Sequence, residues 1–329
     1  MTLTPGYLHR RHQLSYRQID MLLGTTNTHK YQEDVLKGMH MLREFLMICD
    51  MLSEKNIVFV PLKGPCLSQR IYGDNTVKIC HDLDVFIHFR DFVPIYHLLS
   101  ERGFLTEKPF DIKKIDLTWL FYHYKDMKFF HPVRKTVIEL QWRLFTFDMF
   151  MKSDDESFVS KFTEQGTFEG RDIRQLRTEF ELLYLVMHGT AHRWYRLKWL
   201  VDVHEYLKNV KFCQDEFYRL VKIFHAERML GLYNIIAKKF ISDPYYFNIS
   251  VRVPKVLICS CINEIERKVE FSETFTGIVG RSLKKLRYQY MLIPHAGRRK
   301  VLIKKYFKRD LSSKRIKTLV QDKITGKDD

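Results

Sequence analysis

The chain has 329 residues, of which 45% are hydrophobic, and this is enough apolar surface for one to three domains with a core. Its 25 Phe and 17 Tyr exclude a disordered protein. The N-terminus is polar and basic, and there is no run of about 18 apolar residues, so we expect neither a signal peptide nor a transmembrane segment. The six cysteines form no C-x-x-C pair, which predicts reduced thiols and a cytoplasmic protein.

The net charge of +16 is concentrated near the C-terminus. Residues 281–329 hold sixteen Lys and Arg against four Asp, a net charge of +12, which leaves +4 for the other 280 residues. Such a segment favours anionic, phosphate-rich partners through counterion release, although solvated basic helices would have the same composition. Aromatic residues interleaved with the charges suit base stacking and suit helix packing equally well; they are Tyr288, Tyr290, Tyr306 and Phe307.

Hydrophobic periodicity and turn residues predict the elements in chain order. Helices are expected over residues 29–55, 65–72 and 91–102. Strands are expected over residues 56–62, 82–89, 127–130 and 136–144. Gly64 permits a turn between the first strand and the second helix. A polar stretch from Lys152 begins an irregular connection, and from about Arg174 the pattern is helical.

These elements predict an α+β fold: a small mixed β-sheet flanked by helices and followed by an all-α C-terminal domain. We divide the chain into an N-terminal extension, a sheet-containing domain, a helical domain that closes a cleft, and a basic helical C-terminal segment. Their bounds are residues 1–28, 29–150, 151–280 and 281–329.

Two carboxylates lie at the start of the strand expected over residues 82–89. Asp82 and Asp84 are two residues apart, so on a strand they share one face about 7 Å apart. Like charges so placed repel unless a cation lies between them, and Mg²⁺ prefers oxygen ligands of this kind. Glu139, in the strand-like run after Thr136, is a third candidate ligand. Three such carboxylates on neighbouring strands can hold two metal ions for phosphoryl or nucleotidyl transfer.

Other interpretations of these carboxylates stay open. Asp82 and Asp84 would also fit a turn or an edge strand with two solvated acids. Glu139 would also fit an exposed position paired with Arg143 or a neighbouring Lys.

The run LKGPCLSQRIYGDNTVKICHDLDVFI, residues 62–87, resembles the signature of the uncharacterised nucleotidyltransferase family within the DNA polymerase beta-like nucleotidyltransferase superfamily. IELQWRL, residues 138–144, resembles its third-carboxylate strand, where many relatives have His in place of Gln141. The run from Val186 to Trp194 resembles a downstream helical motif. The resemblance spans about residues 40–210. It implies a catalytic nucleotidyltransferase domain at 29–150, with Mg²⁺, or Mn²⁺, bound in a two-metal site by Asp82, Asp84 and Glu139.

Further residues are expected near the nucleotide. Lys63 and Gly64 would lie near the triphosphate, although GxxxxGK[ST] spacing is absent and this is not a P-loop. His188 and His192, four apart on a predicted helix, would share a face with Arg196 close by. We expect the three to contact substrate or phosphates, while buried, hydrogen-bonded histidines remain the alternative.

Two further acids have other expected roles. Asp74 is expected to shape a turn. Asp202 is expected to orient a histidine or to pair with Lys198.

The leading hypothesis is therefore a metal-dependent nucleotidyltransferase that moves a nucleoside monophosphate from an NTP, such as ATP, to a hydroxyl acceptor and releases pyrophosphate. A small hydroxylated molecule, an RNA and a protein hydroxyl all stay open as acceptors. The alternative hypothesis is a non-catalytic nucleic-acid-binding protein that uses residues 281–329.

Overall fold

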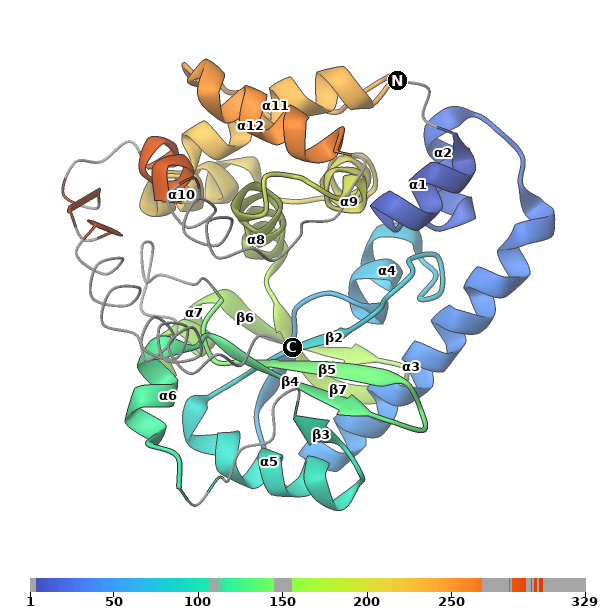
Figure 1. The fold of residues 1–329 in the computed structure, drawn as a ribbon, viewed down its shortest axis with the longest axis vertical. Helices are drawn as coiled ribbons and strands as arrows, with labels where there is room; N and C mark the ends of the chain where they lie inside the picture. Colours follow the sequence, from blue (N-terminus) through green and yellow to red (C-terminus); the bar gives the residue numbers. More distant parts are fainter. Residues whose placement is uncertain are drawn as a thin grey trace, which may run out of the picture.

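The computed structural model describes residues 4–106, 112, 114–144 and 156–267, and in the C-terminal part residues 284, 286–293, 297, 299–300 and 302–303. Within these residues the chain forms a sheet part and a helical part, which are stacked in Figure 1. The predicted α+β class, with a small mixed sheet followed by helices, is confirmed.

In the described part of the chain, the main sheet has five strands in the order β1-β2-β5-β4-β3. The central strands β2 and β5 run parallel, and the other neighbouring pairs run antiparallel. The strand bounds are Phe59–Pro61 (β1), Leu83–Ile87 (β2), Leu105–Thr106 (β3), Asp126–His131 (β4) and Thr136–Gln141 (β5). The four predicted strands are therefore confirmed.

One face of the sheet is apolar. It packs on α3 (Tyr31–Ser53) and α5 (Phe92–Glu101) in a single core. Alternate residues of the two central strands contribute to this core: Leu83, Val85, Ile87, Ile138 and Leu140.

The opposite face of the sheet is polar and is turned towards the helical part. Because side chains alternate along a strand, Asp84, Glu139 and Gln141 project from this face. Phe86 shares the face of Asp84, and it packs in the core of the helical part. The sheet therefore presents its carboxylates to the helices above it.

Gly64 makes the turn between β1 and α4 (Pro65–Tyr72). Its φ of 74° lies in the left-handed region, which glycine adopts without steric cost. Just before it, the amide of Leu62 donates a hydrogen bond to the carbonyl of Asp84 at 3.0 Å. The turn thus begins beside the carboxylate strand, as the sequence predicts.

A β-hairpin lies where we expected an irregular connection followed by helix from about Arg174. β6 (Thr163–Phe168) pairs with β7 (Arg171–Leu176), and α8 begins only at Thr178, so the expected helix start is wrong. Four side chains of the hairpin strands are buried: Thr163, Phe168, Ile173 and Leu176. The strands therefore carry little of the alternating apolar pattern by which strands are recognised.

The helical part has its own core, to which α8 contributes seven of its fourteen residues. The helices are α7 (Glu156–Phe162), α8 (Thr178–Ala191), α9 (Leu197–Asn209), α10 (Gln214–Phe224), α11 (Glu227–Phe240) and α12 (Lys255–Ile265); α6 (Leu117–His123) precedes β4. In the described ranges, no helix is long and apolar enough to cross a membrane.

The first residues form two helices, α1 (Pro5–His12) and α2 (Tyr16–Leu23). Arg11 donates hydrogen bonds to the carbonyl oxygens of Tyr195, Glu264 and Arg267, at 2.9, 3.0 and 3.2 Å. Arg17 forms an ion pair with Asp74, which follows α4, at 2.6 Å. The segment predicted as an N-terminal extension therefore bonds to both parts of the molecule.

Part of the basic C-terminal segment packs on the helical part. Tyr288 is 3% exposed, and its hydroxyl donates to the carbonyl of Thr190 at 2.8 Å. Tyr290 is more exposed and lies under the Arg299 guanidinium. Packing is thus the role of Tyr288. Tyr306 and Phe307 lie outside the described residues, with the rest of the tail.

Candidate active site

Two carboxylates face each other across the central strands. Asp84 of β2 and Glu139 of β5 are direct register partners, and they are 6% and 9% exposed. Asp82 lies just before β2 and is half-buried. Its carboxylate makes no hydrogen bond or ion pair with any other described residue. The solvated-edge interpretation is therefore wrong for Asp84, whose strand is central.

Gln141 links the two facing carboxylates. Its amide Nε2 donates to Asp84 Oδ1 at 2.7 Å and to Glu139 Oε1 at 2.8 Å. Its side chain is buried, two residues beyond Glu139 on the same face of β5. The amide thus places a partial positive charge between two groups that repel each other.

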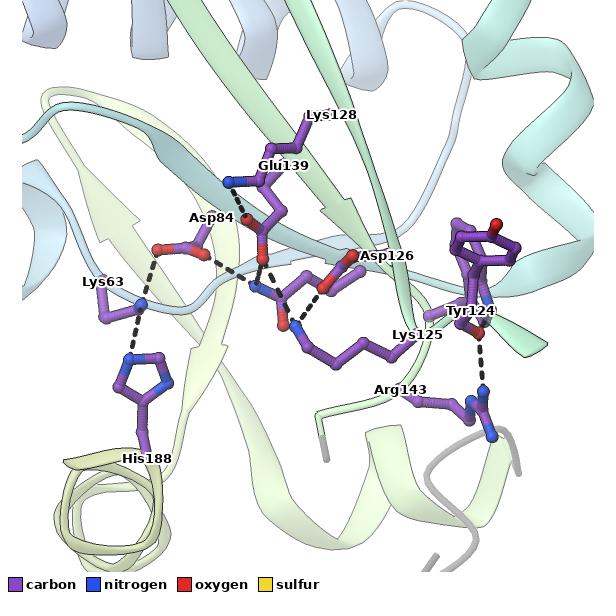
Figure 2. A network of polar contacts seen from close by, with 11 residues as sticks. Lys63, Asp84, Tyr124, Lys125, Asp126, Lys128, Glu139, Arg143 and His188 are labelled. Atoms are coloured by element: carbon purple, nitrogen blue, oxygen red, sulfur yellow. Dashed lines mark hydrogen bonds and ion pairs between the residues drawn. The ribbon is translucent and has the colours of Figure 1, made fainter. Parts of the chain in front are cut away.

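Lys63 provides a full positive charge on the other side of Asp84. Its Nζ lies 2.8 Å from Asp84 Oδ2 and 3.4 Å from Nε2 of His188 on α8 (Figure 2). Burial alone would raise the pKa of Asp84, but the Lys63 ammonium reverses this and holds the pKa below its usual range. In the same way, burial works against the charge of Lys63, and Asp84 outweighs it, so the pKa of Lys63 is raised.

His188 is neutral in this setting. Burial and the nearby Lys63 charge hold the pKa of His188 well below its usual range. A neutral imidazole has one nitrogen lone pair, so Nε2 accepts a hydrogen bond from the Lys63 ammonium. Helix α8 therefore contacts the carboxylate site through Lys63.

Two lysines lie close to Glu139: Lys128 on the neighbouring strand β4, and Lys125 just before that strand. Lys125 Nζ lies 3.4 Å from its Oε1, and Lys128 Nζ lies 3.3 Å from its Oε2. Burial, followed by the charge of Asp84, nevertheless raises the pKa of Glu139 to about 7. Lys125 also pairs with Asp126, and Arg143 donates to the Tyr124 carbonyl instead of to Glu139 (Figure 2). The charged partners of Glu139 are thus lysines, and Arg143 is not among them.

A family model described as "Uncharacterised nucleotidyltransferase" matches residues 26–242, which is more than half of the chain. The chain belongs to this nucleotidyltransferase family. Neither the curated proteins nor the solved structures contain a significant match to it. The family segment contains both central strands and the helices α8 and α9, and so covers every candidate residue named above.

The helical motif from Val186 to Trp194 contains a glycine that close packing requires. A Cβ on Gly189 would lie 2.2 Å from the ring of Trp194, which is fully buried. Arg193 and Trp194 both have positive φ, at 54° and 55°, in the turn that joins α8 to α9. The glycine therefore lets the tryptophan fold back against the helix that carries His188.

His192 and Arg196 lie at the margin of this site. His192 is exposed, and its ring centroid lies 4.7 Å from that of His188 and 4.9 Å from that of Trp199. Arg196 donates to Gln13 Oε1 at 2.7 Å and lies over the Tyr195 ring. The structure thus brings Lys63 and His188 to the carboxylates, whereas the Arg196 guanidinium contacts the N-terminal segment.

Two acidic residues outside the site make structural contacts. Asp74 Oδ1 accepts hydrogen bonds from the amide and the hydroxyl of Thr76, so it shapes a turn as expected. Asp202 pairs with Lys78, a buried lysine that precedes β2, and not with Lys198 as expected. The expected pair of Lys198 with Asp202 on α9 is wrong, because Lys78, distant in sequence, is the partner of this carboxylate in the folded protein.

Lys198 lies close enough to Asp82 and Lys63 to be affected by their charges. Burial, together with the charges of Arg196 and Lys63, lowers the pKa of Lys198 to about 8, although Asp82 opposes this.

Among the described residues, no group of three or more His, Cys, Asp or Glu side chains is arranged to hold a metal ion. Gln141, Lys125, Lys128 and Lys198 were not predicted as site residues. A neighbouring Lys was named only as an alternative partner of Glu139, and Gln141 had a signal in its position two residues from Glu139 on one strand.

Proposed function

We propose that the protein transfers a nucleoside monophosphate from an NTP to a hydroxyl acceptor, in a Mg²⁺-dependent reaction that releases pyrophosphate. The observation that carries this proposal is the facing pair Asp84 and Glu139. They are buried in register on adjacent parallel strands, on the face turned to the helices, in a member of a nucleotidyltransferase family.

The charges of this pair support a divalent cation. Asp84 raises the pKa of Glu139, so the two carboxylates repel each other. Such repulsion is relieved by a hard cation, whose preferred ligands are carboxylate oxygens. Asp82, Asp84 and Glu139 would hold Mg²⁺, or Mn²⁺, in a two-metal site. When bound, the metal would neutralise charge on the phosphates and orient them.

Basic groups next to the carboxylates suit the triphosphate. Lys63 and His188 already meet beside Asp84, and Gly64 begins the turn into α4. Backbone amides of such a glycine turn approach phosphate oxygens closely. His192 and Arg196 would contact the outer phosphates or the acceptor, provided that Arg196 leaves Gln13.

The chemical step follows from these positions. The acceptor oxygen attacks the α-phosphorus in line, and a new oxygen–phosphorus bond forms as the bond to the β-phosphate bridge breaks. Glu139 accepts the proton of the acceptor hydroxyl. Pyrophosphate leaves with the bridging oxygen, and Lys63 offsets its charge.

The experiment is incubation of the protein with Mg²⁺ and each of the four α-³²P-labelled NTPs. Total cell RNA and a metabolite extract serve as acceptor pools, and protein alone tests self-modification. We expect label on one class of acceptor, and none with the Asp82→Ala/Asp84→Ala variant. Folded wild-type protein that labels nothing in any pool would contradict the proposal and favour the nucleic-acid-binding hypothesis.

A further inference from the structure

Both oxygens of Asp84 are already bonded to nitrogen donors of this chain. Lys63 Nζ contacts Oδ2 at 2.8 Å, and Gln141 Nε2 contacts Oδ1 at 2.7 Å. A carboxylate that is to bind a cation must give up at least one such bond. Of the two donors, Gln141 is fixed by its buried position on β5, whereas Lys63 extends from a turn on a long flexible side chain.

Lys63 has a second acceptor. His188 Nε2 lies 3.4 Å from its ammonium, on the helical side of the site. The ammonium has three donors, so a bond to His188 leaves two of them for other acceptors. Lys63 can therefore leave Asp84 and keep a hydrogen-bond acceptor, while the phosphates of an entering nucleotide replace the carboxylate as its counter-charge.

We propose that Lys63 is the exchangeable counter-ion of Asp84: it occupies the carboxylate when no metal is bound, and it moves to the nucleotide phosphates, still bonded to His188, when metal and nucleotide enter together. This inference rests on the proposed function and assigns a positioning role within it. The proposal explains why the Lys63 ammonium contacts the Asp84 carboxylate, at the distance of a charge-assisted hydrogen bond, instead of extending into solvent.

The exchange predicts two changes of opposite sign when the Lys63 charge is removed. A bare divalent ion competes with Lys63 for Asp84, so its binding should become tighter. A metal–nucleotide complex uses Lys63 as a phosphate contact, so its binding should become weaker. A lysine with a purely structural role would weaken both or change neither.

The test measures binding, and no turnover is required. Mn²⁺ alone is titrated into full-length protein, with free Mn²⁺ followed by electron paramagnetic resonance. The titration is repeated with the α,β-methylene analogues of the four NTPs, which cannot transfer a nucleotide. The variants are Lys63→Met and the charge-matched control Lys222→Met. Lys222 is exposed on α10 and contacts none of the candidate site residues.

For Lys63→Met we expect Mn²⁺ alone to bind roughly ten- to a hundredfold more tightly, because a buried competing cation is gone. We expect the nucleotide analogue to bind about tenfold more weakly. Lys222→Met should change Mn²⁺ affinity by less than about threefold, since its exposed charge is screened by solvent.

The outcomes separate the two proposals. If the wild type binds Mn²⁺ with an analogue but Lys63→Met and Lys222→Met change Mn²⁺ affinity equally, the exchange is wrong and the proposed function stands. If no form binds Mn²⁺ or any analogue, both are wrong. If Lys63→Met does not fold, Lys63→Gln, which keeps a neutral donor to Asp84, carries the same comparison.

Discussion

Asp84 and Glu139 are partners across two parallel strands, and the amide of Gln141 donates a hydrogen bond to both. The pair is buried on the face that the sheet turns to the helices. Two acids in such a place must have counter-charges, and Lys63, Lys125 and Lys128 provide them. The arrangement makes the site sensitive to every charge in it.

Asp84→Asn should abolish the reaction and destabilise the fold. We expect label transfer to fall by at least about a hundredfold, because a proposed metal ligand is lost. The free energy of unfolding should fall by about 3 kcal/mol, since Lys63 becomes a buried charge without its carboxylate. Asp215→Asn, at an exposed position of α10, is the control and should change neither quantity. Full activity in Asp84→Asn would remove Asp84 from the mechanism.

The pH dependence of stability should report on Glu139. Its pKa is raised from 4.5 to about 7 by burial and by Asp84. Between these values the folded protein keeps a proton that the unfolded chain has released, so stability falls as pH rises through this window. Urea unfolding in EDTA should show wild type losing about 1–3 kcal/mol from Glu139 across it.

Glu139→Gln should remove this contribution, because the amide does not titrate. Its unfolding free energy, compared with that of the wild type at each pH, isolates Glu139 from the other titrating groups. Parallel pH profiles for the two proteins would show that Glu139 is not protonated at neutral pH.

Gly189→Ala should destabilise the helical part. The added Cβ would lie 2.2 Å from the Trp194 ring, so the buried indole or the backbone of α8 must move. We expect a loss of about 1–3 kcal/mol in the free energy of unfolding. Gly6→Ala on α1 is the matched helical control, because its Cβ would meet only the flexible end of Arg10 at 3.4 Å. Equal effects of the two substitutions would contradict the packing argument.

The Lys78–Asp202 pair should show strong coupling. Both side chains are buried, with 8% and 3% exposed, and the pair joins α9 to the segment before β2. Lys78→Met alone should cost about 3–5 kcal/mol, because Asp202 is left without its partner. Lys78→Met/Asp202→Leu should recover most of this loss, and a double-mutant cycle from urea unfolding measures the coupling. Additive effects would mean that the pair is not formed.

The basic tail should be tested by a cut after the packed residues. Tyr288 and Leu292 are buried, so removal of residues 281–329 would expose the core, and the cut is therefore placed after residue 303. The segment 304–329 has nine Lys and Arg against four Asp. We expect the shorter cut to leave the melting temperature unchanged and to weaken RNA binding. The slope of log affinity against log salt should become smaller by about 0.7 for each lost phosphate contact. An unchanged slope would exclude the tail as an RNA-binding element.

Much of the sheet part could be predicted from the sequence. The β-rich run before Lys63, the glycine turn and the carboxylate strand have local signals, and the structure has each of them. The hairpin of β6 and β7 lacked such a signal, because its stability depends on packing against the rest of the molecule and its own pattern is polar.

The carboxylates of the site could be predicted, but most of their partners could not. Which lysine faces Glu139 depends on the register of β4 against β5, and register is a property of the folded sheet. Asp202 illustrates the same limit. The sequence favours Lys198, four residues away on the same helix, as its partner, whereas in the structure the partner is Lys78, from a segment distant in sequence.

The contacts of Arg11 and Arg17 show that the folded structure of this protein begins before the family segment. The family segment begins at residue 26, yet α1 and α2 lie before it and bond to both parts of the fold. A protein trimmed to the family segment would keep every candidate site residue but would lose the contacts that α1 and α2 make with both parts of the fold. The family match and the folded structure of this chain therefore have different starting points.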